Sequence, residues 1–336
     1  MSRRAALRAV LGIAISVAAA YILLRSVDVP AAIDVLRQAN LVLATLMLVS
    51  VLFDVASRAA RWRSLLAPIA RISYPHVLGY TFVGYLANNV LPARLGELVR
   101  SHALGEGERF SRTTVLGTVV VERIVDTVIV VALAAAAVVV LGVGGIASTA
   151  VALGAAFVGV LIVVLVVAVV SHRLPGVERV TTLIERVPRA LDLGRRLRDG
   201  LSVVSRPRTV AEALVFSLVA WSFSILTFLL GGAALGITIT PVQGALLSSG
   251  VALATIVPSG PGYLGTFELT AVGIASQFGV QRDAAFAMAL LVHAMILLGT
   301  SVGGAISAVR LRVGLSTGGN DEDATEIAAT TSLKSG

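Results

Sequence analysis

One apolar segment of the chain carries three charged side chains that could bind an ionic ligand. The sequence VVVERIVDTVIVV places Glu122, Arg123 and Asp126 inside a hydrophobic run over residues 113–141. At 1.5 Å per residue, Glu122 lies about 10 Å inside a helix that begins near the start of this run. A charge at the centre of a membrane helix costs about 2.5–3.5 kcal/mol, so it normally faces the bundle interior and has a partner. We therefore expect these groups to point into a helix bundle.

The spacing of these charges leaves one carboxylate over. Arg123 and Asp126 are three residues apart, which permits an ion pair on one helix. The remaining carboxylate could meet Arg94 or Arg100. Two interpretations stay open at this point. Either arginines grip a lipid phosphate while the carboxylates orient them or carry a proton, or the charges form a buried ion-pair lock with no ligand. Guanidinium groups suit phosphate oxygens because they can donate two hydrogen bonds at once.

Two short apolar segments end in turns rich in proline and glycine. Residues 77–91 and 242–257 would each make a helix of about 22–24 Å, shorter than the hydrocarbon core of about 30 Å. The first runs into NNVLPARLGELV (residues 88–99), and the second into TIVPSGPGYLGTFELT (residues 255–270). Irregular backbone is tolerated at membrane depth only where protein or a water-filled cavity satisfies it. We therefore predict two re-entrant helical hairpins that line a cavity.

The two turns resemble each other in sequence. The matched positions are Pro92 with Pro258, Gly96 with Gly265, and Glu97 with Glu268. Three predicted spans separate the turns, so the second hairpin would enter from the opposite face, as inverted repeats do. Chance similarity of two loops, and short interfacial loops with ordinary capping, remain as alternatives. The expected substrate-binding residues are Asn88, Asn89, Pro92, Arg94, Glu97, Arg100, Glu122, Arg123, Asp126, Pro258, Gly260, Pro261, Gly262, Gly265 and Glu268.

The composition identifies the elements that must position these residues. Charged residues make up 14% of the chain and hydrophobic residues 57%, whereas about 25% of a soluble domain is charged. The sequence predicts six full membrane spans: Ala5–Leu24, Leu41–Ser57, Thr113–Leu141, Ile146–Val170, Val210–Leu235 and Ala284–Val309. The predicted fold is an all-α polytopic membrane helix bundle of about six spans plus two re-entrant hairpins related as inverted repeats.

The arginines between the spans indicate how the chain is placed in the membrane. Cytoplasmic flanks collect basic residues, which predicts that both termini lie in the cytoplasm. The predicted membrane domain covers residues 1–312, with a first half at about 40–141 and a second at about 210–310. Residues 173–208 predict a basic cytoplasmic segment, either an amphipathic helix on the inner leaflet or a solvated one. Residues 313–336 predict a disordered tail.

Some kinds of chemistry are not expected. The chain has no cysteine and four scattered histidines, so we expect no metal or cofactor. We expect no nucleic-acid partner either, because the basic residues lie between hydrophobic spans. Asp54 and Arg58, four apart near a helix end, favour a pair that sets topology, and Trp62 suits the membrane interface. His293 in LLVHAMILL is typical of a histidine that packs helices together.

Four motifs together resemble the flippase-like family named for the transmembrane region of lysylphosphatidylglycerol synthase. They are RAARWRSLL (residues 58–66), NNVLPARLGELVR (88–100), VVVERIVD (119–126) and VPSGPGYLGTFE (257–268). The resemblance implies an integral inner-membrane protein that moves or handles lipids. Relatives often carry an arginine near the position of His293, so a fixed charge there is in doubt. About 24 residues follow Arg312, so the soluble aminoacyl-transferase domain of bifunctional relatives, and lipid aminoacylation, are not expected.

Three functions remain in competition. The first is a lipid translocator that holds the phosphate headgroup of an anionic or polyprenyl-phosphate lipid in a polar cavity. The second is a membrane-embedded glycosyltransferase acting on a polyprenyl-phosphate carrier, although no phosphate-binding glycine loop supports it. The third is a scaffold without transport activity, and a partner enzyme of a lipid-modification pathway is left open. We favour the translocator, and hence a protein that is not an enzyme.

Overall fold

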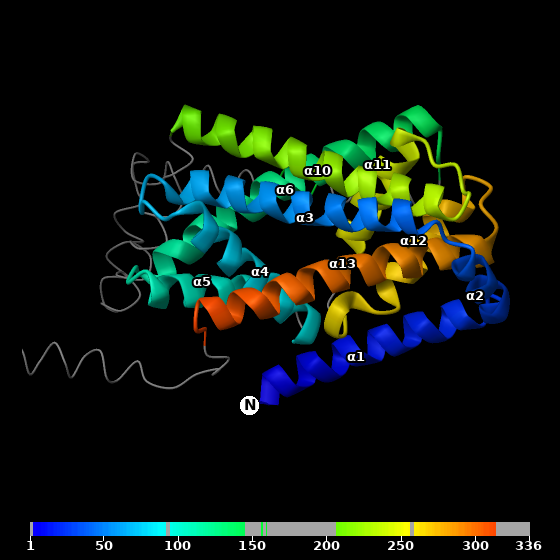
Figure 1. Ribbon diagram of the computed structural model, residues 1–336, viewed down its shortest axis with the longest axis horizontal. Coiled ribbons are helices and arrows are strands. Elements are labelled where there is room, and N and C mark those ends of the chain that lie inside the picture. Colours follow the sequence, from blue (N-terminus) through cyan, green and yellow to red (C-terminus); the bar gives the residue numbers. More distant parts are fainter. Residues whose placement is uncertain are drawn as a thin grey trace, which may run out of the picture.

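The computed structural model describes residues 3–91, 95–144, 206–255 and 259–313, with the single positions 156 and 159. These residues form helices and connecting turns, and no strand occurs among them (Figure 1). Four helices are long and apolar enough to cross a membrane: α3 (Leu41–Leu66), α6 (Arg112–Leu141), α10 (Pro207–Ala234) and α13 (Arg282–Arg310). The prediction of a polytopic helical membrane protein is therefore confirmed.

Two of the four long helices, α3 and α6, begin at side chains that satisfy their first amide groups. The Oδ1 atom of Asn40 accepts hydrogen bonds from the amides of Val42 and Leu43, at 2.9 and 3.2 Å, where α3 begins. Ser111 caps α6 in the same way through the amide of Thr114. Such caps replace bonds that the first turn of a helix cannot make within itself. The two caps explain why α3 and α6 each start directly after a polar residue that precedes the apolar run.

Helices α3 and α10 pack against each other along their length (Figure 1). The hydroxyl of Ser50 on α3 donates to the carbonyl oxygen of Phe223 on α10 at 2.9 Å, and the rings of Phe53 and Phe223 stack 5.3 Å apart. Polar contacts between helices are useful in lipid because apolar burial gives little driving force there. This pair forms one wall of the bundle.

Two pairs of short helices fill the space between the long ones. Helices α4 (Tyr74–Val90) and α5 (Gly96–Gly107) lie in the left half of Figure 1, and α11 (Pro241–Ala254) and α12 (Thr266–Ser276) lie in its right half. A single 3₁₀ turn, η3 (Pro261–Tyr263), precedes α12. The two predicted breaks therefore fall at the ends of α4 and α11, near the positions that the sequence indicates.

The chain begins with a bent pair of helices, α1 (Arg3–Leu24) and α2 (Val29–Arg37). Their parts over 14–24 and 29–37 meet at 86°, and together they could make a fifth span. Helix α1 packs on α12, and the hydroxyl of Ser16 accepts the amide of Gly260 at 2.8 Å. The first predicted span is therefore a helix that supports the second break.

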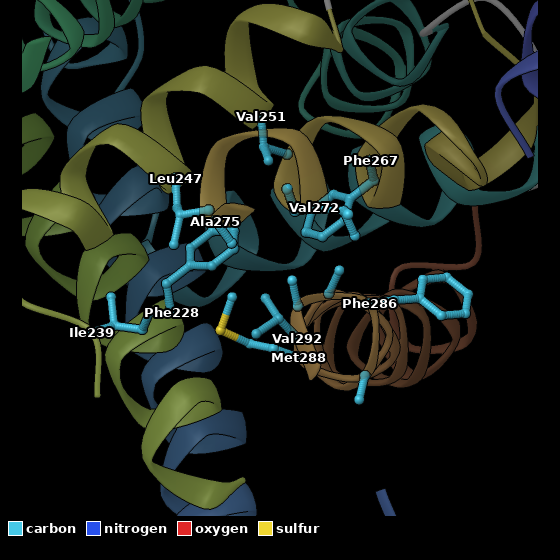
Figure 2. Packing of buried hydrophobic residues seen from close by; sticks show 14 of the residues in the cluster. Phe228, Ile239, Leu247, Val251, Phe267, Val272, Ala275, Phe286, Met288 and Val292 are labelled. Carbon is cyan, nitrogen blue, oxygen red and sulfur yellow. The ribbon is translucent and has the colours of Figure 1, made fainter. Parts of the chain in front are cut away.

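The largest apolar core lies between α10, α11, α12 and α13 (Figure 2). Phe228 of α10 and Phe267 of α12 stack with their ring centroids 6.2 Å apart. Leu247, Met288 and Val292 pack around them and are buried completely. The second hairpin is thus held by close packing of apolar side chains.

Several predictions about organisation lie outside the described residues. The fourth predicted span over 146–170, apart from 156 and 159, is one of them, so the count of six spans stays a prediction. The basic segment 173–208, except for its last three residues, and the tail after residue 313 are the others. The four remaining long spans were predicted to within a few residues, except that α3 continues nine residues past its predicted end at Ser57.

Candidate functional site

A cavity of about 320 Å³ lies inside the bundle, between the two hairpins. Its polar and charged lining comes from nearly every helix of the core and includes Asp54, Arg58, Asn88, Asn89, Glu97, Arg100, Glu122, Arg123, Asp126, Ser224, Thr227 and His293. Its remaining walls are mostly apolar, with Trp221, Phe228 and Phe267 as the large aromatic members. The cavity therefore has a strongly charged side and an apolar side.

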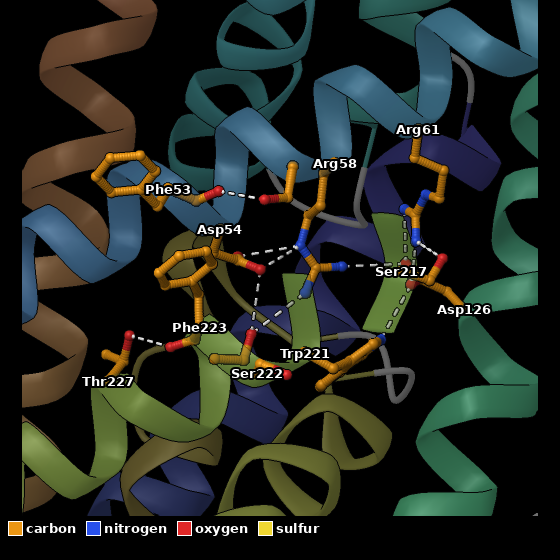
Figure 3. A network of polar contacts seen from close by, with 12 residues as sticks. Phe53, Asp54, Arg58, Arg61, Asp126, Ser217, Trp221, Ser222, Phe223 and Thr227 are labelled. Atoms are coloured by element: carbon orange, nitrogen blue, oxygen red, sulfur yellow. Dashed lines mark hydrogen bonds and ion pairs between the residues drawn. The ribbon is translucent and has the colours of Figure 1, made fainter. Parts of the chain in front are cut away.

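Asp126 of α6 is the centre of the charged side (Figure 3). Both terminal nitrogens of Arg61 donate to its carboxylate, and Arg58 Nη1 donates to Oδ2 at 3.1 Å. The indole of Trp221 donates to Oδ1 at 3.2 Å. A buried charge without partners is strongly unfavourable. Four hydrogen bonds from α3 and α10 satisfy the carboxylate of Asp126. Helices α3 and α6 can pack closely here because the buried arginines of α3 pair with the buried carboxylates of α6.

Glu122 lies one turn earlier on α6 and joins the same cluster. Its Oε1 atom accepts hydrogen bonds from Arg61 Nη2 at 3.0 Å and Arg123 Nη2 at 2.7 Å. Arg100 Nη2 of α5 lies 3.0 Å from the same oxygen. The first hairpin is thereby tied electrostatically to the long helices. The sequence prediction that Arg94 or Arg100 meets the remaining carboxylate is confirmed for Arg100.

The cluster is balanced in charge. Its cations are Arg58, Arg61, Arg100 and Arg123, and its anions are Asp54, Glu97, Glu122 and Asp126. Arg123 pairs with Asp126 at 3.2 Å, as the three-residue spacing predicts, and approaches Glu97 at 3.8 Å. Arg61 is completely buried and does not line the cavity, so it serves as the internal counter-ion of the carboxylates.

Some guanidinium donors of the cavity wall are unused. Within the described residues, Arg100 Nε and Nη2 and Arg123 Nε have no hydrogen-bond partner. The ion pair of Arg100 with Glu122 therefore lacks the alignment of a hydrogen bond. The guanidinium of Arg100 also lies 4.5 Å from the ring centroid of Trp62, which supports it from one side. The side chain of Arg123 is 38% exposed, the highest value in the cluster. Unpaired donors on a cavity wall are suited to an anionic ligand.

A separate pair of ionisable residues lies on the other side of the cavity. His293 Nδ1 of α13 lies 2.6 Å from Glu268 Oε1 of α12, and both side chains are about 4% exposed. The imidazole stacks on Phe267 with centroids 4.2 Å apart. Glu268 Oε2 accepts the amide of Gly265 at 2.7 Å, which caps α12. His293 lines the cavity, and Glu268 lies behind it.

The structure brings many of the predicted site residues together. Seven of them line the cavity: Asn88, Asn89, Glu97, Arg100, Glu122, Arg123 and Asp126. Gly260, Pro261, Gly262, Gly265 and Glu268 belong to the second break but are not part of the lining, and Pro92, Arg94 and Pro258 lie outside the described residues. The two breaks are neighbours, since a Cβ atom on Gly262 would lie 3.6 Å from the carbonyl oxygen of Asn89.

Sequence reasoning missed the contribution of α3. Asp54 and Arg58 do form the expected pair at 3.0 Å, but they line the cavity and are coupled to Asp126. The prediction that Trp62 lies at the membrane interface is wrong, because its side chain is fully buried and donates to Thr118 at 3.1 Å. Arg58 and Arg61 follow Asp54 by four and seven residues, and this spacing predicts that all three lie on one face of a helix.

These features define a polytopic helical membrane protein with a charged cavity between helices. Residues 9–304 match the family described as the lysylphosphatidylglycerol synthase TM region, and the chain belongs to this family. The resemblance found from the motifs is thus confirmed over most of the chain. No curated protein and no solved structure gives a significant match to it.

Proposed function

We propose that this protein is a lipid translocator that binds a phosphate-containing headgroup in the cavity between its two hairpins. The observation that carries the proposal is that Arg100 and Arg123 both line the cavity and keep buried guanidinium donors without a hydrogen bond within the described residues. Arginine is well suited to phosphate because its planar fork donates to two oxygens. Membership of a lipid-related membrane family supports the same substrate class. We place the phosphate beside these two arginines.

The size of the cavity supports binding of a headgroup alone. Its volume of about 320 Å³ is at the lower end of ligand pockets, which range over about 300–1,000 Å³. The acyl or prenyl chains would stay in the bilayer, against exposed apolar residues of the outer helix faces such as Leu218 and Val302. Asn88, Asn89 and Glu97 would contact polar groups of the headgroup. Tyr263 of the second break lines the opposite wall, and the glycines beside it would set the path of that turn.

The arrangement of the hairpins suggests how the headgroup could be reached from both leaflets. The α4–α5 hairpin and the α11–α12 hairpin lie in opposite halves of the bundle and meet at the cavity (Figure 1). We propose that they are inverted repeats and that each half opens in turn toward its own side, as in other transporters of this design. The six-span topology belongs to this proposal.

The distribution of charge supports cytoplasmic termini. Described arginines gather at the end of the bundle where α3 and α13 finish and α10 begins: Arg63, Arg71, Arg109, Arg112, Arg206, Arg208, Arg310 and Arg312. At the other end, Arg25, Arg37 and Arg282 are balanced by Asp28, Asp34 and Asp283. The positive-inside rule places the first end in the cytoplasm, and we propose the inner membrane as its location.

The test is lipid exchange between leaflets by the purified, reconstituted protein. Vesicles would carry fluorescent phosphatidylglycerol or a fluorescent polyprenyl phosphate. Arg123→Gln should lower the exchange rate by at least about tenfold, since a charged hydrogen bond is worth about 1.5–3 kcal/mol. The fold should persist, because Glu122 keeps Arg61 and Arg100, and Asp126 keeps Arg58 and Arg61 as partners.

Arg208→Gln is the matched control. Arg208 is 93% exposed and pairs only with Glu212 four residues later on the same helix, within the described residues. Its replacement should leave exchange within about twofold of the native rate, because an exposed pair contributes little. Unchanged exchange in a folded Arg123→Gln variant would overturn the phosphate site. Release of a nucleoside diphosphate from a sugar donor would point instead to a glycosyltransferase, and the absence of both activities to a scaffold.

A further inference from the structure

The charge balance of the cluster raises a problem for an anionic headgroup. Four arginines already face four carboxylates, so the charges of the cluster sum to zero. A phosphodiester would bring one further negative charge into a site surrounded by helices and lipid. An uncompensated charge in such surroundings is strongly unfavourable. The anion therefore needs a positive charge from elsewhere in the same cavity.

The pair of His293 and Glu268 is placed to supply it. His293 lines the same cavity as Arg100 and Arg123, and its ring is held 2.6 Å from Glu268. With a carboxylate and a neutral imidazole, the pair carries one negative charge. When the imidazole takes up one proton, the pair becomes neutral, and the cavity can accept one anion without a net change in charge.

Resting on the proposed function, we propose that Glu268 and His293 form a proton-binding site that takes up one proton with each anionic headgroup. Histidine is the side chain whose charge ordinarily changes between about pH 5 and 8. The stacking on Phe267 and the capping of Gly265 by Glu268 hold both groups in place through the exchange. The proton stays on the imidazole, and no covalent bond of the lipid changes.

The surroundings of the pair leave it as the titratable group that faces the apolar side of the cavity. Helices α10 and α11 pack Phe228 and Val251 in the same apolar core as Phe267 (Figure 2), and the polar residues that they place in the cavity are the neutral Ser224, Thr227, Ser248 and Thr255. Tyr263 of η3 and Tyr85 of α4 share the cavity, as do Asp54 and Arg58 of α3, which are already paired with each other. Asp28 before α2 donates its amide to Asp283 near the start of α13, so the charged residues of that end lie about 15 Å from His293 along α13.

Proton uptake on lipid binding tests the proposal directly. The full chain in lightly buffered detergent would be titrated with phosphatidylglycerol, which is anionic, and with phosphatidylethanolamine, which carries its own positive charge. A pH-indicator dye should report about one proton taken up per phosphatidylglycerol bound, and none for phosphatidylethanolamine. In parallel, the Kd for phosphatidylglycerol should rise by up to about tenfold per pH unit between about pH 6 and 8, as expected for one linked proton.

Three variants identify the proton site. His293→Gln should abolish proton uptake and flatten the pH dependence of the Kd, and Glu268→Gln should lower the uptake, because the imidazolium loses its counter-ion. His76→Gln is the control, because His76 Nδ1 lies 2.7 Å from Glu108, the same kind of pair, but its side chain is 54% exposed at the end of the bundle. It should behave as the native protein does. Thermal unfolding of each variant in detergent would show whether the fold is kept.

The outcomes separate this proposal from the proposed function. If phosphatidylglycerol binds and exchanges between leaflets with no proton uptake and a Kd that does not change with pH, the proton site is wrong and the translocator stands. Proton uptake that persists in a folded His293→Gln variant also overturns it. If neither lipid binds at any pH, the proposed function fails, and the proton site fails with it.

Discussion

The two hairpins begin their second helices with the same device and then diverge in chemistry. The amide of Gly96 at the start of α5 donates to Asn88 Oδ1, and the amide of Gly265 before α12 donates to Glu268 Oε2, both at 2.7 Å. Side chains thus complete the first turn of each helix. In α5, however, the acceptor comes from the preceding helix, whereas in α12 it comes from the same helix, three residues after the glycine.

The helices that follow differ more. Helix α5 carries Glu97 and Arg100 into the charged cluster. Helix α12 carries Phe267, Ala271 and other buried apolar residues into the main hydrophobic core, with Glu268 as its one buried charge. Apolar packing therefore positions both hairpins, because Val77 of α4 and Leu104 of α5 also belong to a buried apolar cluster, but within the described residues ion pairs with arginine are added only at the first. Two breaks of similar sequence can therefore supply the charged side and the apolar side of the same cavity.

Replacement of Arg61, in the charged cluster, should lower stability more than any other substitution proposed below. Arg61 bridges Glu122 and Asp126 and donates to Ser217 at 2.9 Å, and it is completely buried. Arg61→Met should lower the free energy of unfolding by about 3–5 kcal/mol, because it leaves two buried carboxylates short of a partner. Thermal unfolding in detergent, followed by circular dichroism, measures this loss.

Arg63→Met is the control for that variant. Arg63 is two residues away on the same helix, but it is exposed and donates only to the carbonyl of Ile72 at 3.3 Å, within the described residues. Its replacement should cost less than about 1 kcal/mol. Equal unfolding temperatures for the two variants would show that the buried ion pairs between α3 and α6, on which the charged side of the cavity is built, do not stabilise the bundle.

Gly96→Ala and Gly265→Ala test the close approach of the chain at the start of α5 and of α12. A Cβ atom on Gly96 would collide with the carbonyl oxygen of Gly84, and one on Gly265 would lie 2.6 Å from that of Ser16. Gly265 also has a φ of +83°, a conformation that alanine adopts poorly. Each variant should lose about 1–3 kcal/mol of stability through crowding, as measured by thermal unfolding.

Gly273→Ala tests whether the loss comes from the close approach. A Cβ atom on Gly273 would meet nothing within 4 Å, and the residue lies inside α12. This variant should unfold at the native temperature or slightly above it, since alanine favours a helix over glycine by about 1 kcal/mol. Gly96→Ala with the same profile would mean that α4 and α5 can separate without cost, contrary to the packing described.

The sequence predicts the spans well because hydropathy is a local property. Long apolar runs alone identify α6, α10 and α13. Hydropathy predicts the end of α3 too early, because Arg58 and Arg61 resemble the polar flank of a span. They are in fact helical and buried, since α6 supplies carboxylates for them. No local pattern reveals that pairing, which arises only when α3 packs on α6.

The site was predictable where the anomaly was local. Glu122, Arg123 and Asp126 stand out because charges in the middle of an apolar run are expensive. Trp62 and Trp221 do not, because tryptophan is common both at membrane interfaces and in cores. Their role at the cavity depends on Arg100 and Asp126, which are 38 and 95 positions away along the chain. Long-range partners of this kind are absent from any single segment.

The smallest expected effect tests the cap that distinguishes the first hairpin. Asn88→Ala removes the acceptor of the Gly96 amide and should lower stability by about 1 kcal/mol. Gln277→Ala is the control, because the exposed side chain of Gln277 makes no hydrogen bond within the described residues. The same variant should weaken phosphatidylglycerol binding a few-fold, because Asn88 itself lines the cavity and because the loosened turn lies one turn before Arg100, and a lipid titration would measure this loss. If Asn88→Ala loses stability and keeps full affinity, Arg100 is held by Glu122 and Trp62 alone, and the cap serves only the fold of the hairpin.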